Sequence, residues 1–279
     1  MFAIKKILFP VDFSDRCQGA ARYVEAIAAR FKAEVHLLHV VEPLPEPAGI
    51  PISEWVESRR ESLERQYKDE FPFVKLVQAT SLGDPAYHII EYANQHGIDL
   101  IMMPTHGWGP YRRFLLGSVT AKVLHDAKCP VWTGVHLEQA PPIEEIAFRK
   151  LVAAVDLGAH SGAILSWTKA FAEEYGGEVV VAHAVPGFDT KPEIDMDQEF
   201  SSELARRAKE ELAKVQAGSG TAWPMELASG DPAHVLGSIA KQFGADLMVI
   251  GRSELHGLGR LRASGYSIIR NAPCPVISV

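Results

Sequence analysis

Short apolar runs alternate with longer segments of helical period along both halves of the chain. The runs are nearly continuous in Ile, Leu and Val, as is usual for strands that helices cover on both faces. Five such runs alternate with four helical segments in each half, which predicts two α/β units built on doubly wound parallel sheets. The strands of the first half are predicted near Lys5–Val11, Glu34–Val41, Phe73–Ala79, Ile98–Met103 and Val131–Val135.

Chemical signals mark the starts of the helices between these runs. Asp84 stands directly before Pro85, so its carboxylate is expected to cap a helix whose first position is proline. Asp231 and Pro232 repeat this arrangement in the second half, and both aspartates are interpreted as structural caps. The helices of the first half are predicted near Asp15–Phe31, Ser53–Glu70, Pro85–His96 and Ser118–Asp126.

The second half of the chain repeats the first. Four pairs of motifs recur with nearly constant spacing, which indicates two whole domains rather than the short units of a solenoid. The domains are predicted at residues 1–137 and 148–279, with a segment of linker character at 136–147. The recurring pairs are Asp12 and Asp156, His39 and His183, Gly83–Pro85 and Gly230–Pro232, and Cys129–Val131 and Cys274–Val276.

The second half gives the same order of elements. His183 repeats His39 at a matching strand position, which indicates a shared packing or hydrogen-bonding role more than two catalytic sites. The long second helix carries a core-facing stripe of Phe200, Leu204, Ala208 and Leu212. The strands are predicted near Lys150–Val155, Glu178–Val185, Ala222–Ala228, Leu247–Ile250 and Val276–Val279.

Composition and charge narrow the function classes. The 28 Lys and Arg residues against 35 Asp and Glu give a net charge of −7, which argues against a general nucleic-acid surface. The sequence shows no long apolar span, no secretory leader and, among its three cysteines, no Cys-x-x-Cys pair. We therefore expect a soluble cytoplasmic protein without nucleic-acid or membrane partners.

The segment from Pro104 to Val119 is the strongest functional signal. It follows the apolar run Ile98–Met103 and ends at a predicted helix start. Gly107 permits close approach of the backbone to a ligand. The unpaired N–H groups of a helix that begins at Gly117–Val119 attract an anion. The segment therefore predicts a phosphate-holding loop with a nucleotide as its ligand.

This loop resembles the ATP loop of the universal stress protein family, and the repeat resembles the tandem members of that family. Gly107, nine intervening residues and Gly117-Ser118 keep the family spacing, but Pro104 stands where the family has a further glycine. Proline fixes φ and removes the N–H, so that part of the pattern is lost. The resemblance implies an adenine nucleotide alpha hydrolase-like fold with strand order 3-2-1-4-5 in each half. It also implies ATP, with or without Mg²⁺, as the ligand of the first half.

The same resemblance gives each residue of the first-half site a role. It places a carboxylate near the adenine, two valines beside the base, the loop at the ribose and phosphates, and an arginine and the helix start at the phosphates. In that order the residues are Asp12; Val40 and Val41; Met103, Pro104, Thr105, His106 and Gly107; and Arg113, Gly117, Ser118 and Val119.

The residues by themselves leave alternatives open. Asp12 and Ser118 are residue types that also cap helices, so either could be structural only. His106 is a loop histidine with no second ligand at metal spacing beside it. We therefore predict no catalytic residue and no metal-binding residue.

The second half has lost most of the loop signature. It keeps Gly251 as the first glycine, but Glu254 replaces Gly107, and Ser264-Gly265 stands where Gly-Ser is expected. A carboxylate at the phosphate position repels an anion by roughly 1 kcal/mol even in water. The second half is therefore not expected to hold ATP.

The last strand of each half is expected to lie at a sheet edge, and an unpaired edge invites another strand. The resemblance implies that the two edges pair. The chain would then be an intramolecular pseudo-dimer, and two chains could associate further as a homodimer.

The leading functional hypothesis is a stress-response protein that binds ATP or another adenine nucleotide in its first half as a conformational or assembly signal. Two alternatives are a nucleotide-free scaffold or carrier for another small ligand, and a weak ATP hydrolase. The sequence contains no Gly-x-x-x-x-Gly-Lys-Ser/Thr loop and no paired carboxylates for phosphoryl transfer. Any hydrolysis is therefore expected to be slow.

Overall fold

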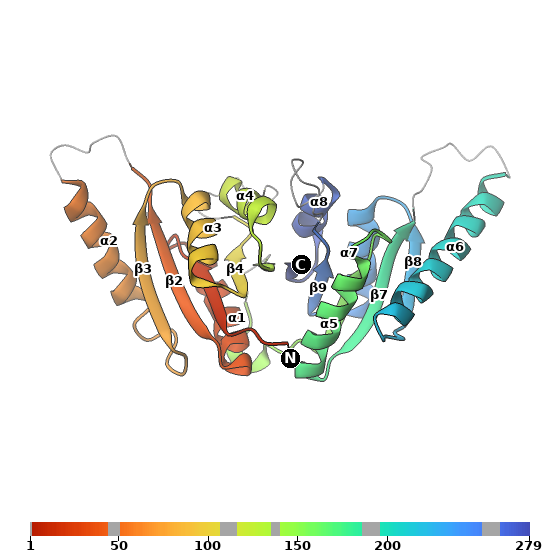
Figure 1. The fold of residues 1–279 in the computed structure, drawn as a ribbon, viewed down its shortest axis with the longest axis horizontal. Coiled ribbons are helices and arrows are strands. Elements are labelled where there is room, and N and C mark those ends of the chain that lie inside the picture. The colour runs from red at the N-terminus through yellow and green to blue at the C-terminus, as the bar shows by residue number, and fades with distance from the viewer. Residues whose placement is uncertain (1, 44–50, 107–115, 135–139, 186–195, 253–262) are drawn as a thin grey trace. The chain divides into compact units, whose positions relative to one another are not determined.

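The computed structural model divides the chain into two compact units, Met1–Ile146 and Ala147–Val279 (Figure 1). It describes residues 2–43, 51–106, 116–134, 140–185, 196–252 and 263–279. Helices and parallel strands alternate in both units, and the prediction of two doubly wound α/β sheets is confirmed. No helix in these ranges is both long and apolar enough to cross a membrane.

The first unit contains one five-stranded parallel sheet in the order β3-β2-β1-β4-β5, as predicted. β1 is the central strand, since Ile7 pairs with Val35 of β2 on one side and with Leu100 of β4 on the other. The strands are β1 Lys6–Pro10, β2 Glu34–Val41, β3 Leu76–Leu82, β4 Leu100–Pro104 and β5 Val131–Gly134. The helices are α1 Asp15–Phe31, α2 Ile52–Gln66, α3 Pro85–His96 and α4 Ser118–Asp126, followed by the short 3-10 helix η2 Ile143–Glu145.

The second unit repeats this order as β8-β7-β6-β9-β10. The pairing of its last strand with that of the first unit stays a prediction. The strands are β6 Lys150–Ala154, β7 Glu178–Val185, β8 Met225–Ser229, β9 Leu247–Ile250 and β10 Val276–Ser278. The helices are α5 Ser161–Tyr175, α6 Met196–Gly218, α7 Pro232–Phe243 and α8 Ala263–Asn271.

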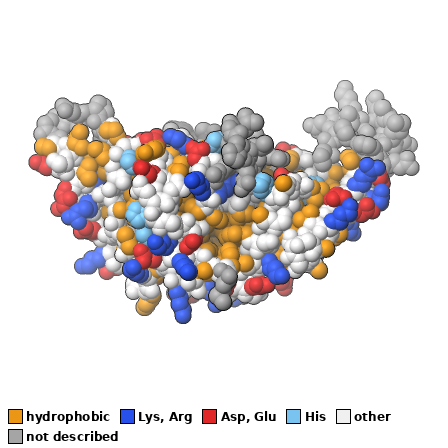
Figure 2. Space-filling model, viewed as in Figure 1, with side chains coloured by type: hydrophobic (Ala, Val, Ile, Leu, Met, Phe, Trp, Pro, Cys, Tyr) orange, Lys and Arg blue, Asp and Glu red, His pale blue; other side chains and the backbone are white. Residues whose placement is uncertain are grey.

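The central strands form the core of each unit because helices cover both of their faces. Ile7, Leu8 and Phe9 of β1 have no exposed surface, and neither do Leu151 and Val152 of β6. Such continuous burial explains why these strands lack the alternation of a sheet that is wet on one side. Charged side chains lie outside this core, and on the face drawn in Figure 2 the acidic and basic ones are interspersed.

One strand of each unit begins later than predicted. β3 begins at Leu76 rather than Phe73, whose side chain is 88% exposed in the preceding turn. β8 begins at Met225 rather than Ala222, because the Trp223 N–H donates to the Gln216 side chain, 2.7 Å away, instead of to a strand. In both places the apolar residues just before the strand read in the sequence as part of it, although they lie outside it.

The second helix of the first unit ends at Gln66, four residues before the predicted Glu70. The chain turns there because Tyr67 and Phe71 pack inward against Phe9, with ring centroids 6.2 and 6.4 Å from its ring. Burial of these aromatic rings favours the turn over another turn of helix.

Asp84 and Asp231 cap their helices as predicted. Asp84 Oδ1 accepts a hydrogen bond from the Tyr87 N–H at 2.7 Å, and Asp231 Oδ1 accepts one from the His234 N–H at 3.0 Å. The glycine before each aspartate has φ +140°, a conformation that residues with a side chain rarely adopt. The repeated Gly-Asp-Pro turn is therefore a device for starting a helix.

We expect Asp231→Ala to lower the stability of the chain by about 1 kcal/mol, because the His234 N–H loses its acceptor. Urea denaturation of this variant measures the loss. Asp231→Asn keeps an oxygen at the same place and serves as the control. A loss of equal size in both variants would contradict the capping role.

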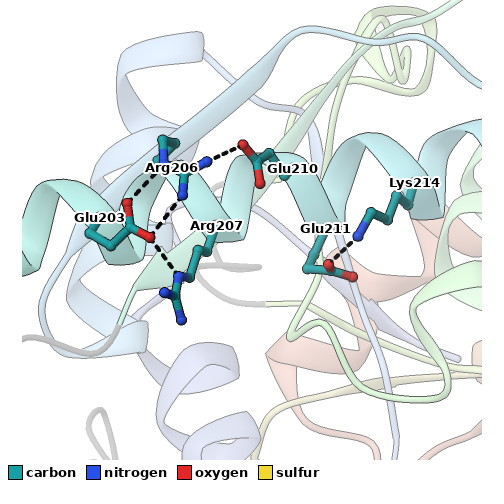
Figure 3. Close-up of polar contacts among 6 residues, drawn as sticks. All are labelled: Glu203, Arg206, Arg207, Glu210, Glu211 and Lys214. Atoms are coloured by element: carbon teal, nitrogen blue, oxygen red, sulfur yellow. Dashed lines mark hydrogen bonds and ion pairs between the residues drawn. The ribbon is translucent and has the colours of Figure 1, made fainter.

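The exposed face of α6 carries a ladder of ion pairs (Figure 3). Glu203 receives hydrogen bonds from the Arg206 and Arg207 side chains at 2.7–2.8 Å, which lower its pKa to about 2. Lys214 reaches Glu211 at 2.6 Å, and Arg206 also pairs with Glu210. Such exposed pairs add little stability and are screened by salt.

The opposite face of α6 carries the predicted core stripe. Ala208 is 7% exposed and Leu212 is fully buried, whereas Leu204 is only partly buried. The side chain of Phe200 lies outside the described residues. The packing of α6 on its sheet therefore depends mainly on the C-terminal half of the helix.

A histidine is buried at the start of β2. His36 is 3% exposed, its Nδ1 lies 2.9 Å from the Tyr92 hydroxyl, and its Nε2 lies 3.0 Å from a Glu34 oxygen. Burial lowers the pKa of His36, and the charges of His96 and Lys6 act in the same direction, against that of Glu34. The folded chain therefore favours neutral His36.

We expect this histidine to make the first unit less stable in acid. Because the unfolded chain binds a proton at His36 near pH 6.5 and the folded chain resists it, stability is retained above that pH and lost below it. Thermal melting between pH 8 and 5 measures the slope, and His36→Gln should reduce it. An unchanged slope in His36→Gln would show that another group causes the acid sensitivity.

Candidate functional site

A cleft of about 710 Å³ opens at the carboxyl ends of β1, β2 and β4 in the first unit. The strand order reverses at β1, so the connections after β1 and β4 leave in opposite directions and open a crevice for a ligand. The predicted site residues that line this cleft are Asp12, Val40, Val41, Met103, Pro104, His106, Gly117, Ser118 and Val119.

Of the predicted site residues that the structure describes, Thr105 alone does not line the cleft. Thr105 is buried, with 5% of its surface exposed, and its Oγ1 lies 3.0 Å from Nδ1 of His106. Gly107 and Arg113 lie outside the described residues. Their predicted contacts with the ligand stay predictions.

The turn after β1 is organised by Asp12. Its Oδ1 accepts hydrogen bonds from the Ser14 N–H at 3.0 Å, the Ser14 hydroxyl at 2.6 Å and the Cys17 thiol at 3.0 Å. Phe13, between them, has φ 63°, a left-handed conformation that costs a non-glycine residue roughly 1–2 kcal/mol. Asp12 therefore holds a strained turn at the start of α1 and also lines the cleft.

The Cys17 thiol, which also lines the cleft, is held in its protonated form. Burial and the adjacent Asp12 carboxylate raise its pKa far above the ordinary range. A thiol in this state is a weak nucleophile. Cys17 therefore acts as a hydrogen-bond donor to Asp12 and as part of the cleft wall.

His39 forms part of the cleft wall at the end of β2. Its Nδ1 donates to the Val11 carbonyl at 2.8 Å, and its ring lies 4.4 Å from the Phe13 ring. Burial lowers its pKa, so His39 is neutral at pH 7 and carries its lone pair on Nε2. His183 Nδ1 makes the equivalent bond to the Val155 carbonyl at 2.7 Å, which agrees with the repeated role expected from the sequence.

The first turn of α4 forms the opposite side of the cleft. Gly117 is the N-cap residue and has no side chain that could bond to the N–H groups of that turn. The amides of Ser118, Val119 and Thr120 also have no acceptor within the helix, and all three residues line the cleft. These N–H groups and the positive end of the helix dipole suit an anion.

The backbone approaches closely at Gly117. Its N–H donates to the Thr105 carbonyl at 2.8 Å, and a Cβ added there would lie 3.3 Å from the His106 Cα. The Thr120 hydroxyl donates to the Pro104 carbonyl at 3.1 Å. These bonds fix the start of α4 against the end of β4, and glycine is the residue that fits there without displacing its neighbours.

The two units differ both at the position of Pro104 and at the helix residue that faces it. In the second unit Gly251 stands at this position, and a Cβ added to it would lie 2.8 Å from the Ile164 side chain of α5. The equivalent residue of α1, which packs against β4, is the fully buried Ala20. The first unit therefore combines Pro104 with the small residue Ala20, and the second unit combines Gly251 with the larger Ile164.

The cleft is also lined by two residues of α2 that the sequence analysis did not predict. Trp55 and Arg59 lie one helical turn apart, and the Arg59 guanidinium carbon is 4.2 Å from the centre of the Trp55 ring. The signal that could have revealed them is Trp55 itself. It is a large aromatic residue in a mostly polar helix, in which Leu63 is the buried residue. The other lining residues that were not predicted for the site are Pro10, Val11, Phe13, Cys17, Leu38, His39, Glu42, Pro85, Ile89 and Thr120.

The second unit has a smaller cleft, of about 280 Å³, at the equivalent strand ends. Asp156, Gly251, Ser264 and Ile164 are among its lining residues. Leu157 has φ 60°, so the left-handed turn after the first strand is repeated. Glu254 lies outside the described residues. In the described part of the chain, no group of three or more His, Cys, Asp or Glu side chains is placed to hold a metal ion.

The family model of the universal stress protein family matches residues 3–133 and 147–279. The chain belongs to the universal stress protein family. The two matches cover both structural units, so the chain carries two domains of this family in tandem, as the repeat predicted.

Curated relatives agree with this membership, and solved structures resemble the fold. A universal stress protein of Methanocaldococcus jannaschii is 39% identical over 137 residues, which are 46% of this chain and 79% of that protein. The crystal structure of a universal stress protein from Archaeoglobus fulgidus covers 99% of this chain and 96% of its own, with a TM-score of 0.69 and 21% identity. A universal stress protein solved in complex with cAMP is 21% identical and covers 49% of this chain and 99% of its own, with a TM-score of 0.40.

Proposed function

We propose that the first unit binds ATP or another adenine nucleotide and that the bound nucleotide acts as a conformational or assembly signal. The observation that carries this proposal is the start of α4, where the amides of Ser118, Val119 and Thr120 line a cleft at the reversal of the strand order. Gly117 lets the start of α4 lie close to the backbone of Thr105 and His106, which places these amides at the cleft.

The other side of the cleft suits a base. Val11, Val40 and Val41 supply apolar surface at the ends of β1 and β2, beside the neutral ring of His39. Apolar walls with a few polar groups are typical of small-ligand sites, and 710 Å³ is within the usual range of about 300–1,000 Å³. The base would lie at the valines and the phosphates at α4.

Asp12 and Glu42 are the acidic side chains that line this cleft within the described residues. A magnesium ion bound with ATP needs few protein ligands, because the phosphates and water supply most of its coordination. Asp12 would therefore meet Mg²⁺ only as part of the nucleotide complex. Gly107 and Arg113 belong to the proposed phosphate site on the resemblance alone.

The second unit is proposed to be a partner domain rather than a second ATP site. Its cleft of about 280 Å³ is smaller, and Ile164 is one of its lining residues, whereas the equivalent Ala20 of the first unit does not line the larger cleft. The proposal includes two assembly steps. They are the pairing of the last strands of the two units and the association of two chains as a homodimer.

Native mass spectrometry of freshly purified protein, followed by calorimetric titration with ATP, ADP, AMP and adenosine, tests the proposal. We expect one adenine nucleotide per chain. Absence of binding at millimolar ATP, or a different copurified small molecule in the cleft, would favour the carrier alternative. Release of ADP and phosphate in ATP and Mg²⁺ at more than a slow rate would instead favour the hydrolase.

A further inference from the structure

We propose that Arg59 and Trp55 of α2 form a stacking wall for the nucleotide base, with Arg59 in contact with the base and Trp55 holding its guanidinium flat. This inference rests on the proposed function and adds a residue pair that determines affinity for the base. It also predicts which part of the nucleotide α2 recognises.

The two side chains are placed to act together. They are four residues apart on one face of α2, and the Arg59 guanidinium lies 4.2 Å from the Trp55 ring centre. Both are partly buried and both line the cleft, on a helix whose other side chains are mostly exposed. A guanidinium stacked on an indole has fewer conformations left to lose when a ligand packs against it.

Arg59 differs from its neighbour in its ionic partners. Arg60 bonds to Glu57 and Glu64 on the exposed face of α2, with distances of 2.5–3.2 Å. Arg59 has no carboxylate partner in the described part of the chain. Its charge reaches the cleft, because it adds to the effect of burial in lowering the pKa of His39. Arg59 therefore presents to the cleft a planar cation that has no ion-pair partner among the described residues.

The strand order separates Arg59 from the phosphate side. α2 packs on β2 and β3, whereas α4 follows β4, and β1 lies between β2 and β4. Two strand spacings are about 10 Å. A nucleotide with its phosphates at the start of α4 would thus bring its base, not its phosphates, toward Arg59. Guanidinium planes stack well on bases, which are electron-rich and flat.

In the described part of the second unit, no such wall lines the cleft. Its cleft is lined by residues of the strand ends and of α5, α7 and α8, and by none of the described residues of α6. Among the described residues, a wall of helix side chains of this kind lines only the larger cleft of the first unit. This difference supports a ligand-related role for the pair over a general role in the fold.

Arg59→Ala should weaken adenosine, AMP and ATP by the same factor of about ten, since loss of stacking acts on the base that all three share. Arg59→Lys keeps the charge but not the plane, and should weaken all three nearly as much. Arg60→Ala removes an arginine from the neighbouring position outside the cleft and should change none of them. Trp55→Phe should give an intermediate loss and reduce the tryptophan fluorescence change on binding.

Calorimetry of these four variants separates the outcomes, with circular dichroism to confirm equal helix content. A loss that grows from adenosine to ATP and is rescued by Arg59→Lys would make Arg59 a phosphate contact and overturn the stacking role. Equal affinities of Arg59→Ala, Arg60→Ala and the unmodified chain would also overturn it while leaving the proposed function intact. Failure of the unmodified chain to bind any of the three ligands would refute both proposals together.

Discussion

Replacement of Gly117 by aspartate is expected to lower the ATP affinity of the first unit by about 100-fold or more. The new Cβ would lie 3.3 Å from the His106 Cα, so His106 must shift slightly away from the start of α4. The carboxylate would also add a negative charge at the start of α4, beside the proposed phosphate site, and two like charges 4 Å apart repel by roughly 4 kcal/mol near a protein surface. Equilibrium titration with ATP measures the loss.

Two further variants separate the causes of this loss. Gly117→Ala adds the Cβ without the charge and should cost less affinity. Ser264→Asp places a carboxylate at the equivalent position of the second unit, where Ser264 is exposed, and should leave ATP binding unchanged. Adenosine binding should be affected far less than ATP binding by Gly117→Asp. Unchanged ATP affinity in Gly117→Asp would mean that the phosphates do not lie at α4.

Trp132→Ala is expected to destabilise the first unit by about 3–5 kcal/mol, the usual cost of truncating a large buried aromatic side chain. Trp132 lies in β5, has no exposed surface, and its ring packs 5.1 Å from the Tyr23 ring of α1. Its removal leaves a cavity between the sheet and this helix. The shift of the urea transition measures the effect.

Trp132→Phe is the matched control. The smaller ring keeps most of the contact with Tyr23 and removes the indole Nε1, which has no hydrogen-bond partner among the described residues. The phenylalanine variant should therefore lose less than half as much stability as the alanine variant. A Trp132→Ala protein within about 1 kcal/mol of the unmodified chain would show that this region repacks easily.

The order of the elements could be predicted because its signals are local. α3 begins and ends where the sequence indicates, since Asp84 and Pro85 mark its start and Gly97, with φ 60°, its end. The start of β3 could not be predicted in this way. Phe73 continues an apolar run, and only the packing of Tyr67 and Phe71 decides that the chain is still turning there.

The same distinction applies to the site. Asp12 and Gly117 were predicted because strand ends and glycine-marked helix starts can be recognised in a short stretch of sequence. Trp55 and Arg59 were missed because no local pattern tells which face of a mostly polar helix will turn toward a cleft made by other strands. His39 was recognised only as a repeated position, since its bond to the Val11 carbonyl joins two strands distant in sequence.

The residue at the end of the fourth strand and the residue facing it on the first helix differ together between the two halves. Gly251 and Ile164 fit each other in one half, and Pro104 has Ala20 at the matching helix position in the other. A chimera that transplants the strand end alone would bring a proline ring toward the end of the Ile164 side chain in the second half, and would combine glycine with alanine in the first. The Ile164 side chain must then turn aside, whereas a hybrid that exchanges both positions together avoids this shift.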